Sequence, residues 1–538
     1  MSQKKVNRKL ILAGGMAAVM VMSLSACNST SDTSDSSTAL SETAGTETVE
    51  TSSQAESEAS TGNEDSYNVV IEWISIGNTP SEENLQLVEE AINEITVPEI
   101  NCTVTLYPVE ISSLKNDTAL AISTGEKLDL VVSVGTGVGD LVTQGLIENL
   151  DPYLADYGRD LSSCLGDALA GGYYDNSLYG VPNAYIQSEK YGFLARTDLL
   201  DKYGIVIDSE KLYTMDELGE IFKTVKEGEG EGFYCVAGLT STSDLFTEYL
   251  GTVDKLGATT ASGGLLLADS WDNTTIANIY SSDQYKAFAN STYNWAQAGY
   301  IPSDAASNTD DGSVQLQAGN YFGRFFYTTE GAASGMGEQI GYELTNIEMS
   351  PPYKTTDRYQ NILWSVPVTS EDPQKAFEFL NLLYADNDID TLLMYGLEGV
   401  TYNVVEENSN GDKVVDFVEG VTADTAPYFC YAGVYGDRLS WPVWVPNSIS
   451  FNESLREFNN SVTNISPALG YCFELTDQVS SKYSAAFSVV QQYTPIISAG
   501  SVDPETSLAE FEKALEDAGI QDVIAENQKQ LDEWLAEK

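Results

Sequence analysis

The chain has 538 residues, with 81 acidic and 26 basic side chains, so its formal net charge is −55, and it contains no histidine. The absence of histidine excludes Ser-His-Asp and Cys-His catalysis as well as His-ligated zinc or haem. The shortage of Lys and Arg argues against a nucleic-acid partner, because neutralising phosphates requires clustered cations. An apolar fraction of 42% over this length is enough for two or more domains with sizeable cores.

The N-terminal residues predict export and a lipid anchor. A basic stretch precedes an apolar stretch from Leu10 to Met22, which is followed by Leu24-Ser25-Ala26-Cys27. This apolar stretch is shorter than the roughly 20 residues that cross a bilayer, so residues 1–26 are expected to be a cleaved signal peptide. The four residues ending in Cys27 resemble the lipobox of bacterial lipoproteins, in which the cysteine thiol carries a diacylglycerol. The alternative is ordinary signal-peptide cleavage with an incidental cysteine.

Residues 27–66 are expected to form a lipidated cysteine followed by a disordered acidic linker. From Asn28 to Ser66 the chain is rich in Ser, Thr, Glu and Asp, has almost no apolar residue and has no basic one. Such a segment cannot bury enough surface to offset its ordering entropy. We therefore predict a tether between membrane and body.

The body contains five cysteines, an odd number, so they cannot all pair within the chain. Apolar neighbours favour buried thiols over a disulfide framework, and no C-x-x-C pair suggests a thiolate metal site. We expect no metal and no cofactor. The five residues are Cys102, Cys164, Cys235, Cys430 and Cys472.

The first part of the body alternates between predicted strands and helices. Asn68 to Ile76, Cys102 to Val109 and Leu128 to Val134 are predicted strands, and Ser81 is a plausible N-cap for the helix after the first of them. This order indicates a mostly parallel α/β sheet, on which ligands bind at the carboxyl ends of strands. The turn from Gly135 to Gly139 is not a dinucleotide fingerprint, because Asp140 occupies the position of the third glycine.

The C-terminal part has equally clear local signals. Asp372-Pro373 is predicted to begin a helix, because Asp is a good N-cap and Pro fits the first turn. Val404-Val405 and Val414-Val415 flank an Asn-Gly-containing turn, which predicts a hairpin. Two amphipathic helices separated near Gly519 are expected to end the chain.

Several short segments occur in a characteristic order along the body. Read together, they resemble the extracellular solute-binding protein family 1, the carbohydrate-binding lipoproteins of ABC importers. A tail from Glu526 to Trp534 resembles a C-terminal extension found on a subset of these lipoproteins. One departure is Gly319-Asn320-Tyr321-Phe322, where the family commonly has Gly-Lys-x-Ala-Met. Tyr395-Gly396-Leu397-Glu398-Gly399, like the tail, resembles that C-terminal extension. The segments that carry the resemblance to the family are Leu128-Asp129-Leu130, 144–151, Leu178-Tyr179-Gly180-Val181-Pro182, 193–200, Gln317-Ala318-Gly319-Asn320 and 372–376.

The resemblance implies the α/β, two-lobe, periplasmic-binding-protein-like fold of type II, with the ligand between lobes joined by three crossings. Lobe I would comprise 67–183 and 364–400. Lobe II would comprise 184–363 and 401–538, including a C-terminal helical extension. The crossings would lie near Pro182 to Gln187, Ile362 to Pro367 and Gly399 to Asn403. It also implies a monomer anchored on the outer face of a bacterial cell membrane, with an ABC permease and ATPase as partners.

A neutral sugar requires aromatic platforms for its ring faces and planar polar groups for its hydroxyls. Trp364, on the expected middle crossing, is the preferred platform, and a packed hinge tryptophan is the alternative. For every other candidate a structural or solvated role is the alternative, and Trp73 is expected to lie in the core. The remaining candidate ligand-binding residues are Asn78, Thr136, Tyr185, Gln187, Arg324, Tyr327, Glu398, Trp441 and Trp444.

Two other functions remain open at the level of sequence. A receptor for peptides or another non-sugar solute would share the fold and the anchor but would need groups that match a peptide backbone. An enzyme would need a carboxylate pair with the spacing of a glycosidase, and 81 acids provide such pairs by chance. We therefore predict a receptor that is not an enzyme.

Overall fold

The computed structural model describes residues 66–538 except 136 and 431–432. The predictions about the signal peptide, Cys27, nearly all of the linker and Thr136 lie outside the described residues. Within the body, the local predictions are confirmed: β1 is Tyr67–Ser75, β2 is Cys102–Glu110, and α1 is Glu82–Ile100 with the Ser81 hydroxyl accepting from Asn84 N–H.

Lobe I is built on a mixed sheet. β1 pairs in parallel with β2, and Ile71 of β1 bridges in parallel to Leu130, just before β3 (Val131–Val134). β13 (Ile362–Ser365) is antiparallel to both β3 and β6 (Val181–Pro182). Besides α1, the helices of this lobe are α2 (Leu114–Thr124), α3 (Gly139–Thr143), α4 (Asp151–Tyr157), α5 (Arg159–Leu165), α12 (Pro373–Leu382) and α13 (Asn387–Tyr395).

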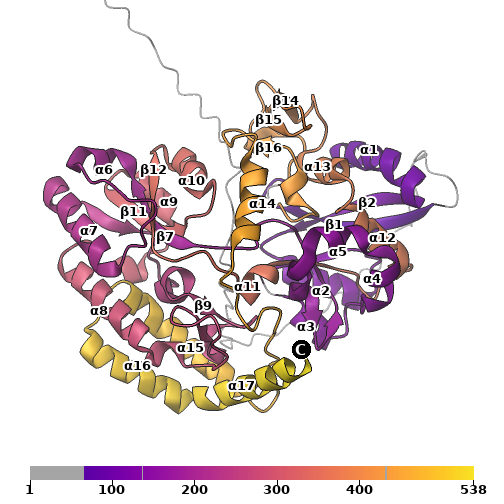
Figure 1. Ribbon diagram of the computed structural model, residues 1–538. Helices are drawn as coiled ribbons and strands as arrows, with labels where there is room; N and C mark the ends of the chain where they lie inside the picture. Colours follow the sequence, from indigo (N-terminus) through magenta and orange to yellow (C-terminus); the bar gives the residue numbers. More distant parts are fainter. Residues whose placement is uncertain (1–65, 136, 431–432) are drawn as a thin grey trace, which may run out of the picture.

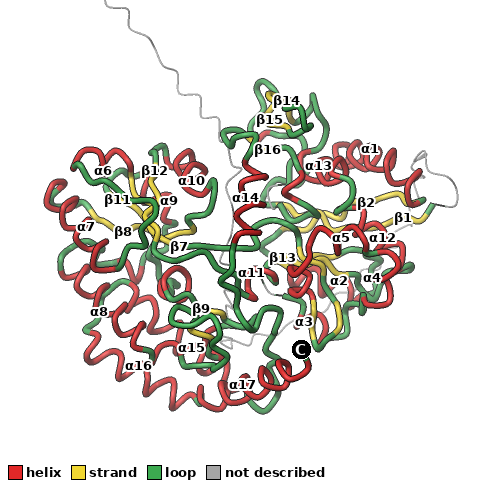
Figure 2. The backbone as a smooth tube through the Cα atoms, viewed as in Figure 1, coloured by secondary structure: helices red, strands yellow, loops and turns green. Residues whose placement is uncertain are grey.

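Lobe II is built on a second sheet in the order β12-β7-β11-β8. Its strands are β7 (Tyr191–Arg196), β8 (Tyr234–Ala237), β11 (Tyr321–Tyr327) and β12 (Leu344–Glu348). Figures 1 and 2 show the two lobes side by side, each with helices around its strands. The helices of lobe II are α6 (Thr197–Tyr203), α7 (Met215–Glu229), α8 (Asp283–Gln297), α9 (Gly312–Gln317), α10 (Ala332–Ile340), α15 (Ser480–Ser498), α16 (Pro504–Ala518) and α17 (Ile520–Glu537).

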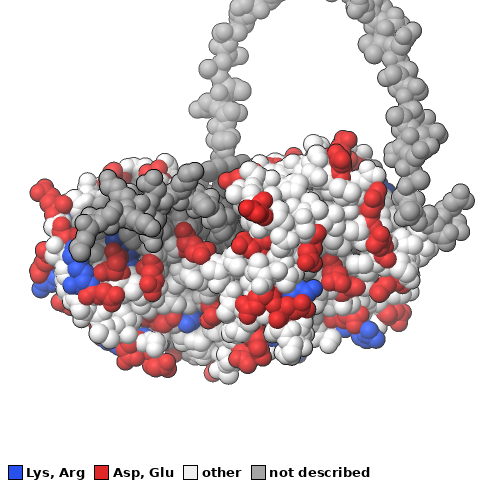
Figure 3. All heavy atoms as spheres, turned by 90° about the horizontal axis from the view of Figure 1, so that it is seen from above, with Lys and Arg blue, Asp and Glu red and all other residues white. Residues whose placement is uncertain are grey.

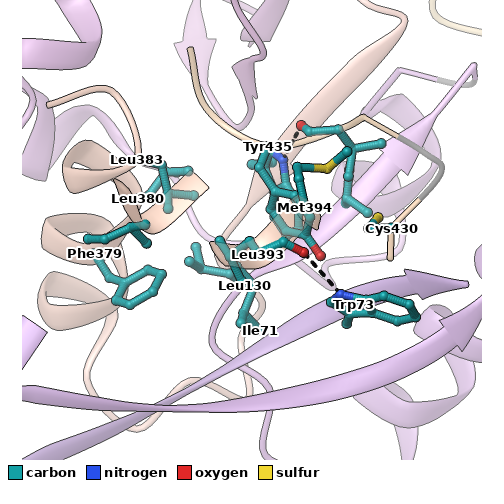
Figure 4. Close-up of a cluster of buried hydrophobic side chains, with 14 of the residues drawn as sticks. Ile71, Trp73, Leu130, Phe379, Leu380, Leu383, Leu393, Met394, Cys430 and Tyr435 are labelled. Atoms are coloured by element: carbon teal, nitrogen blue, oxygen red, sulfur yellow. Dashed lines mark hydrogen bonds between the residues drawn. The ribbon is translucent and has the colours of Figure 1, made fainter. Parts of the chain in front are cut away.

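Residues 401–444 pack on lobe I, which corrects their predicted assignment to lobe II. The hairpin β14 (Tyr402–Glu407) and β15 (Lys413–Phe417) forms where predicted, and β16 (Val443–Trp444) pairs with β15. Cys430 and Tyr435 share the lobe I core with Ile71 and Leu393, as Figure 4 shows. The sequence indicated the hairpin but not which lobe it would cover.

Three crossings join the lobes, as predicted, but two lie elsewhere than expected. The first spans 183–190 and the second spans 349–361, which includes α11 (Thr356–Tyr359). The third contains α14 (Phe451–Ser461) and continues to 466, whereas the expected positions at Ile362 to Pro367 and Gly399 to Asn403 lie in or beside lobe I. The second crossing ends before Ile362 because residues 362–365 form β13 of the lobe I sheet. The third crossing lies later in the chain because residues 401–444 pack on lobe I.

The crossings are hydrogen-bonded to one another. Glu189 and Tyr353 exchange two backbone hydrogen bonds of 2.9 Å, and Lys354 N–H donates to Asn464 at 2.9 Å. The buried Asn459 side chain accepts from Gln187 and Ser188 N–H, both at 3.1 Å, and donates to the Tyr185 carbonyl at 2.6 Å. Hydrogen bonds therefore link all three crossings into one hinge.

The C-terminal helices α16 and α17 split at Gly519, as predicted, and α17 runs beneath both lobes in Figure 1. All five body cysteines are free, which confirms the preference for thiols. Among the charged side chains on the surface seen in Figure 3, acidic ones are more frequent than basic ones. No helix in the described part of the chain has both the length and the apolar character needed to span a membrane.

Candidate ligand-binding site

The strand directions place the carboxyl ends of both sheets at the hinge. β7 starts from the first crossing and is antiparallel to β11 and β12, so both of these strands end at the hinge. β13 starts from the second crossing and is antiparallel to β3, so β3 also ends there, and β1 runs in the direction of β3. Carboxyl ends of strands are the preferred ligand sites of such sheets. The candidate site is therefore where the two edges meet the crossings.

On the lobe II side, five residues form what we call the hinge cluster: Glu189, Tyr191, Tyr327, Tyr353 and Arg358. The Arg358 guanidinium donates to the Glu189 carboxylate and lies 4.3 Å from the centre of the Tyr327 ring. The Tyr191 hydroxyl also donates to Glu189, at 2.6 Å, and the Tyr191 and Tyr327 ring centroids are 4.9 Å apart. Burial and the Glu189 carboxylate raise the pKa of Tyr353 well above its usual value.

A second group, which we call the turn cluster, comprises Asp244, Glu248, Lys255 and Asp357. Glu248 lies in a π-helical turn, Phe246–Leu250, a rare geometry that is frequent at functional sites. Burial and the neighbouring Asp244 raise the pKa of Glu248 to about 7. Burial also raises the pKa of Asp357 to about 7, opposed by Lys255, whose Nζ lies 3.8 Å from its carboxylate, and supported by Asp254 and Glu189.

The Glu248 carboxylate has no ion pair to any residue that the structure describes, and a hydrogen bond with the Asp244 backbone opposes the rise of its pKa. The Asp244 carboxylate accepts from the Tyr280 hydroxyl at 2.7 Å. Lys255 is flanked by strained backbone, since Thr252 and Leu256 have φ values of 46° and 62°. Backbone strain of this kind persists only where the surrounding structure enforces it, and it is frequent at ligand-binding sites. The turn cluster therefore offers a half-buried acceptor beside a cation.

Trp271 is the aromatic residue that the sequence reasoning missed. Its ring centroid lies 5.7 Å from that of Tyr353, at an interplanar angle of 34°, which joins it to the rings of the hinge cluster. Five of the seven tryptophans are buried, whereas Trp271 and Trp534 keep part of their surface exposed. The available signal was its sequence, because Ser270-Trp271-Asp272-Asn273 places a tryptophan in a polar loop.

On the lobe I side, Asn78 and Tyr185 lie where they were expected, at a strand end and on the first crossing. The Asn78 side chain donates to the Phe429 carbonyl at 2.5 Å. The Arg438 guanidinium covers the Tyr185 ring at 3.7 Å from its centre. Gly433, near Arg438, has a φ of 62°, a left-handed conformation that explains the glycine. Of the six arginines in the described residues, Arg438 alone makes no ion pair. No motif in the sequence identified Arg438 as a candidate ligand-binding residue.

Three predicted platforms are core residues, which corrects those predictions. Trp364 is fully buried, donates to the Val434 carbonyl at 2.8 Å and stacks on Tyr435. Trp444 is buried against Phe417 and the Tyr395 ring, and Trp441 is buried beside Tyr395. All three rings are covered because residues 401–444 fold back onto lobe I.

The other predicted polar residues are dispersed. Gln187 is half-buried on the first crossing, with its backbone held by Asn459. Glu398 is exposed in the turn between α13 and β14. Arg324 of β11 lies 3.8 Å from Asp311 and over the Phe326 ring, and it contributes to the electrostatic environment of Glu248 and Tyr249. The structure thus places Arg324 near the turn cluster and Tyr327 in the hinge cluster, and it leaves Glu398 apart from both.

Comparison with known proteins assigns the fold and the family. Residues 87–387, more than half of the chain, match the family model described as bacterial extracellular solute-binding protein. The chain belongs to the bacterial extracellular solute-binding proteins. This confirms the predicted family and the two-lobe type II fold. Residues 467–536 of this solute-binding protein also match a domain of unknown function (DUF3502), which covers α15 to α17.

Several relatives of this solute-binding protein have descriptive names. A carbohydrate ABC transporter substrate-binding protein of Streptococcus pneumoniae serotype 4 is 26% identical over 484 residues, or 87% of this chain and 91% of the relative. The crystal structure of the N-glycan transport solute-binding protein NgtS of S. pneumoniae matches with a TM-score of 0.74 and 22% identity, over 87% of this chain and 99% of NgtS. A human-milk-oligosaccharide (HMO)-binding protein of Bifidobacterium longum infantis matches with a TM-score of 0.58 and 17% identity, over 88% and 100%.

Proposed function

We propose that this solute-binding protein captures an oligosaccharide outside the cell and delivers it to an ABC importer. The observation that carries the proposal is the gathering of aromatic rings and planar charged groups at the carboxyl edge of lobe II, beside the hinge. The relatives support the solute class, since a relative of 26% identity is a carbohydrate ABC transporter component, and NgtS and an HMO-binding protein share the fold.

The chemistry of the edge suits a sugar. Trp271, Tyr249 and Tyr327 supply partly exposed rings that can cover the apolar face of a pyranose. Glu248 and Asp357 supply acceptors for sugar hydroxyls, while Lys255 supplies a donor. The ring-plus-acceptor pattern is the one that a neutral sugar requires.

The lobe I edge would contribute the opposing contacts. Asn78 and the Arg438 guanidinium lie at this edge, with Tyr185 supporting the arginine. The planar guanidinium of Arg438 can donate two parallel hydrogen bonds, and it forms no ion pair with a carboxylate of the described residues. Thr136, at the end of β3, and Gln187 remain proposed contacts.

Lobe closure would couple capture to transport. A ligand that touches both edges binds a closed state better than an open one, and the three crossings can distribute the torsional change. A differential affinity of about 5.5 kcal/mol moves the population from 1:99 to 99:1. The closed form of a single chain would then present both lobes to the permease together.

The protein would be held at the membrane by its lipid. The proposal rests on the basic and apolar N-terminal segment, on Leu24-Ser25-Ala26-Cys27, and on the acidic segment that follows. A diacylglycerol on Cys27 would provide the anchor, and the 27–66 linker would give the body reach.

A binding screen tests the proposal against its alternatives. Thermal unfolding is measured with gluco-, manno-, galacto- and fructo-oligosaccharides and with a peptide library of matched concentration. A ligand at 100 times its dissociation constant should add about 2.7 kcal/mol to the free energy of unfolding. Stabilisation by peptides alone would contradict the proposal. Chemical turnover of a labelled oligosaccharide would show an enzyme instead of a receptor.

A further inference from the structure

A cavity of about 650 Å³ lies in lobe II, beside the carboxyl ends of β11 and β12. It is bounded by Lys190 of the first crossing, by the loop that follows β11, by α10 and by β12. Its size falls within the range of about 300 to 1,000 Å³ that is usual for small-ligand pockets. The cavity adjoins the hinge cluster, because Thr328 follows Tyr327 and Lys190 follows Glu189 in the chain.

Two polar atoms in its wall have no hydrogen-bond partner. Thr329 is 2% exposed, and its buried hydroxyl is unpaired, as is the buried side-chain oxygen of Asn346. The Asn346 amide nitrogen is already used, since it donates to the Thr328 carbonyl at 3.0 Å. A buried polar atom without a partner destabilises the protein, so these positions favour a ligand that supplies hydroxyls.

The charges around the cavity favour an uncharged ligand. Glu330, Glu338 and Glu343 line it, and its one basic lining residue, Lys190, is paired at 2.7 Å with Glu348. An anion would therefore meet three carboxylates and no unpaired cation among the lining residues. A further negative charge placed beside these carboxylates would be repelled by them.

The third crossing reaches the same place. A side chain at Gly331, in the loop lining the cavity, would come within 2.5 Å of the Phe451 ring at the start of α14. Gly331 lies between the cavity and Phe451, and Lys190 of the first crossing lines the cavity directly, so a ligand in the cavity lies beside the hinge.

We infer that this cavity is a subsite for additional units of a neutral oligosaccharide. The ligand would extend past the end of β11 from the rings of Trp271, Tyr249 and Tyr327, which we call the aromatic side. The inference rests on the proposed function and deepens it, because it states that the ligand is uncharged and longer than the aromatic side alone accommodates. Thr329 and Asn346 are its hydroxyl contacts.

The test uses the whole protein and a length series of neutral gluco-, manno-, galacto- and fructo-oligosaccharides, from one unit to six, with calorimetry as the readout. Ala333→Leu narrows the cavity, and Thr329→Val removes the unpaired hydroxyl with almost no change of shape. Matched controls are Ala298→Leu and Thr224→Val, at exposed positions outside the cavity. Oligouronates of the same lengths provide the charged comparison.

We expect the affinity of the wild type to rise with chain length. Ala333→Leu and Thr329→Val should each lose about three- to tenfold on the long ligands and leave short ones unchanged, which corresponds to one lost polar or packing contact. Oligouronates should bind at least about tenfold more weakly than neutral chains. Short sugars that bind as tightly as long ones, or long sugars insensitive to both variants, would overturn the subsite and leave sugar capture standing. If no sugar of any length binds, both the proposed function and the subsite fail.

Discussion

Replacing Arg358 with methionine is expected to destabilise the protein more than removing any exposed cation. Arg358 pairs with Glu189, and both side chains are only 7% exposed. Methionine removes the charge but keeps much of the volume, so the Glu189 carboxylate would be left with the Tyr191 hydroxyl at 2.6 Å and the Thr355 hydroxyl at 3.4 Å. Leaving a buried charge unpaired typically costs about 3 to 5 kcal/mol, a large share of the 5 to 15 kcal/mol that holds a native protein together.

Guanidinium unfolding at pH 7, followed by tryptophan fluorescence, measures this loss. The double variant Glu189→Gln with Arg358→Met should recover much of the stability, because neither charge is then left alone. Lys513→Met is the matched control, since Lys513 and Asp517 form an ion pair in which both side chains are more than two-thirds exposed, and its free energy of unfolding should not change measurably. An Arg358→Met protein within about 1 kcal/mol of the wild type would refute the view that this pair secures the hinge.

Three further predictions concern the site and the anchor. Trp271→Ala should weaken sugar binding by about 1 to 3 kcal/mol in calorimetry, while Trp534→Ala on α17 should not, and equal effects would remove Trp271 from the site. The pKa of Glu248 is raised from 4.5 to about 7, so between these pH values the folded state binds more protons than the unfolded state. The wild type should therefore lose stability relative to Glu248→Gln as pH rises from 4.5 through 7. A difference in melting temperature between the two proteins that is constant with pH would contradict this. Cys27→Ser should release the body or leave it as uncleaved precursor in cell fractionation, and normal processing with normal membrane retention would argue against lipidation.

The sequence predicted the local elements well because their signals are local. Ser81 and Asp372 cap their helices, Gly519 separates the last two helices, and β1 and β2 lie within a residue or two of the expected strands. Each of these depends on backbone conformation and periodicity within a few residues.

The long-range packing was harder to predict. Trp364 carries the same apolar pattern whether it faces a ligand or the core, and only the docking of residues 401–444, through Tyr435 and its neighbours, determines that it is covered. The π-helical turn around Glu248 and the strained backbone at Thr252 and Leu256 have no sequence signature, because they arise from the tertiary structure. Trp271 was visible as a tryptophan in a polar loop, but its approach to Tyr353 depends on the second crossing.

The central claim is that a sugar draws the two lobes together at the hinge. Small-angle X-ray scattering of the unlipidated protein, with and without the oligosaccharide that stabilises it most, measures this directly. The account predicts a smaller radius of gyration at saturating sugar, since a ligand that contacts both edges favours the closed state. An unchanged radius of gyration with the site fully occupied would contradict closure and indicate a rigid, preformed site.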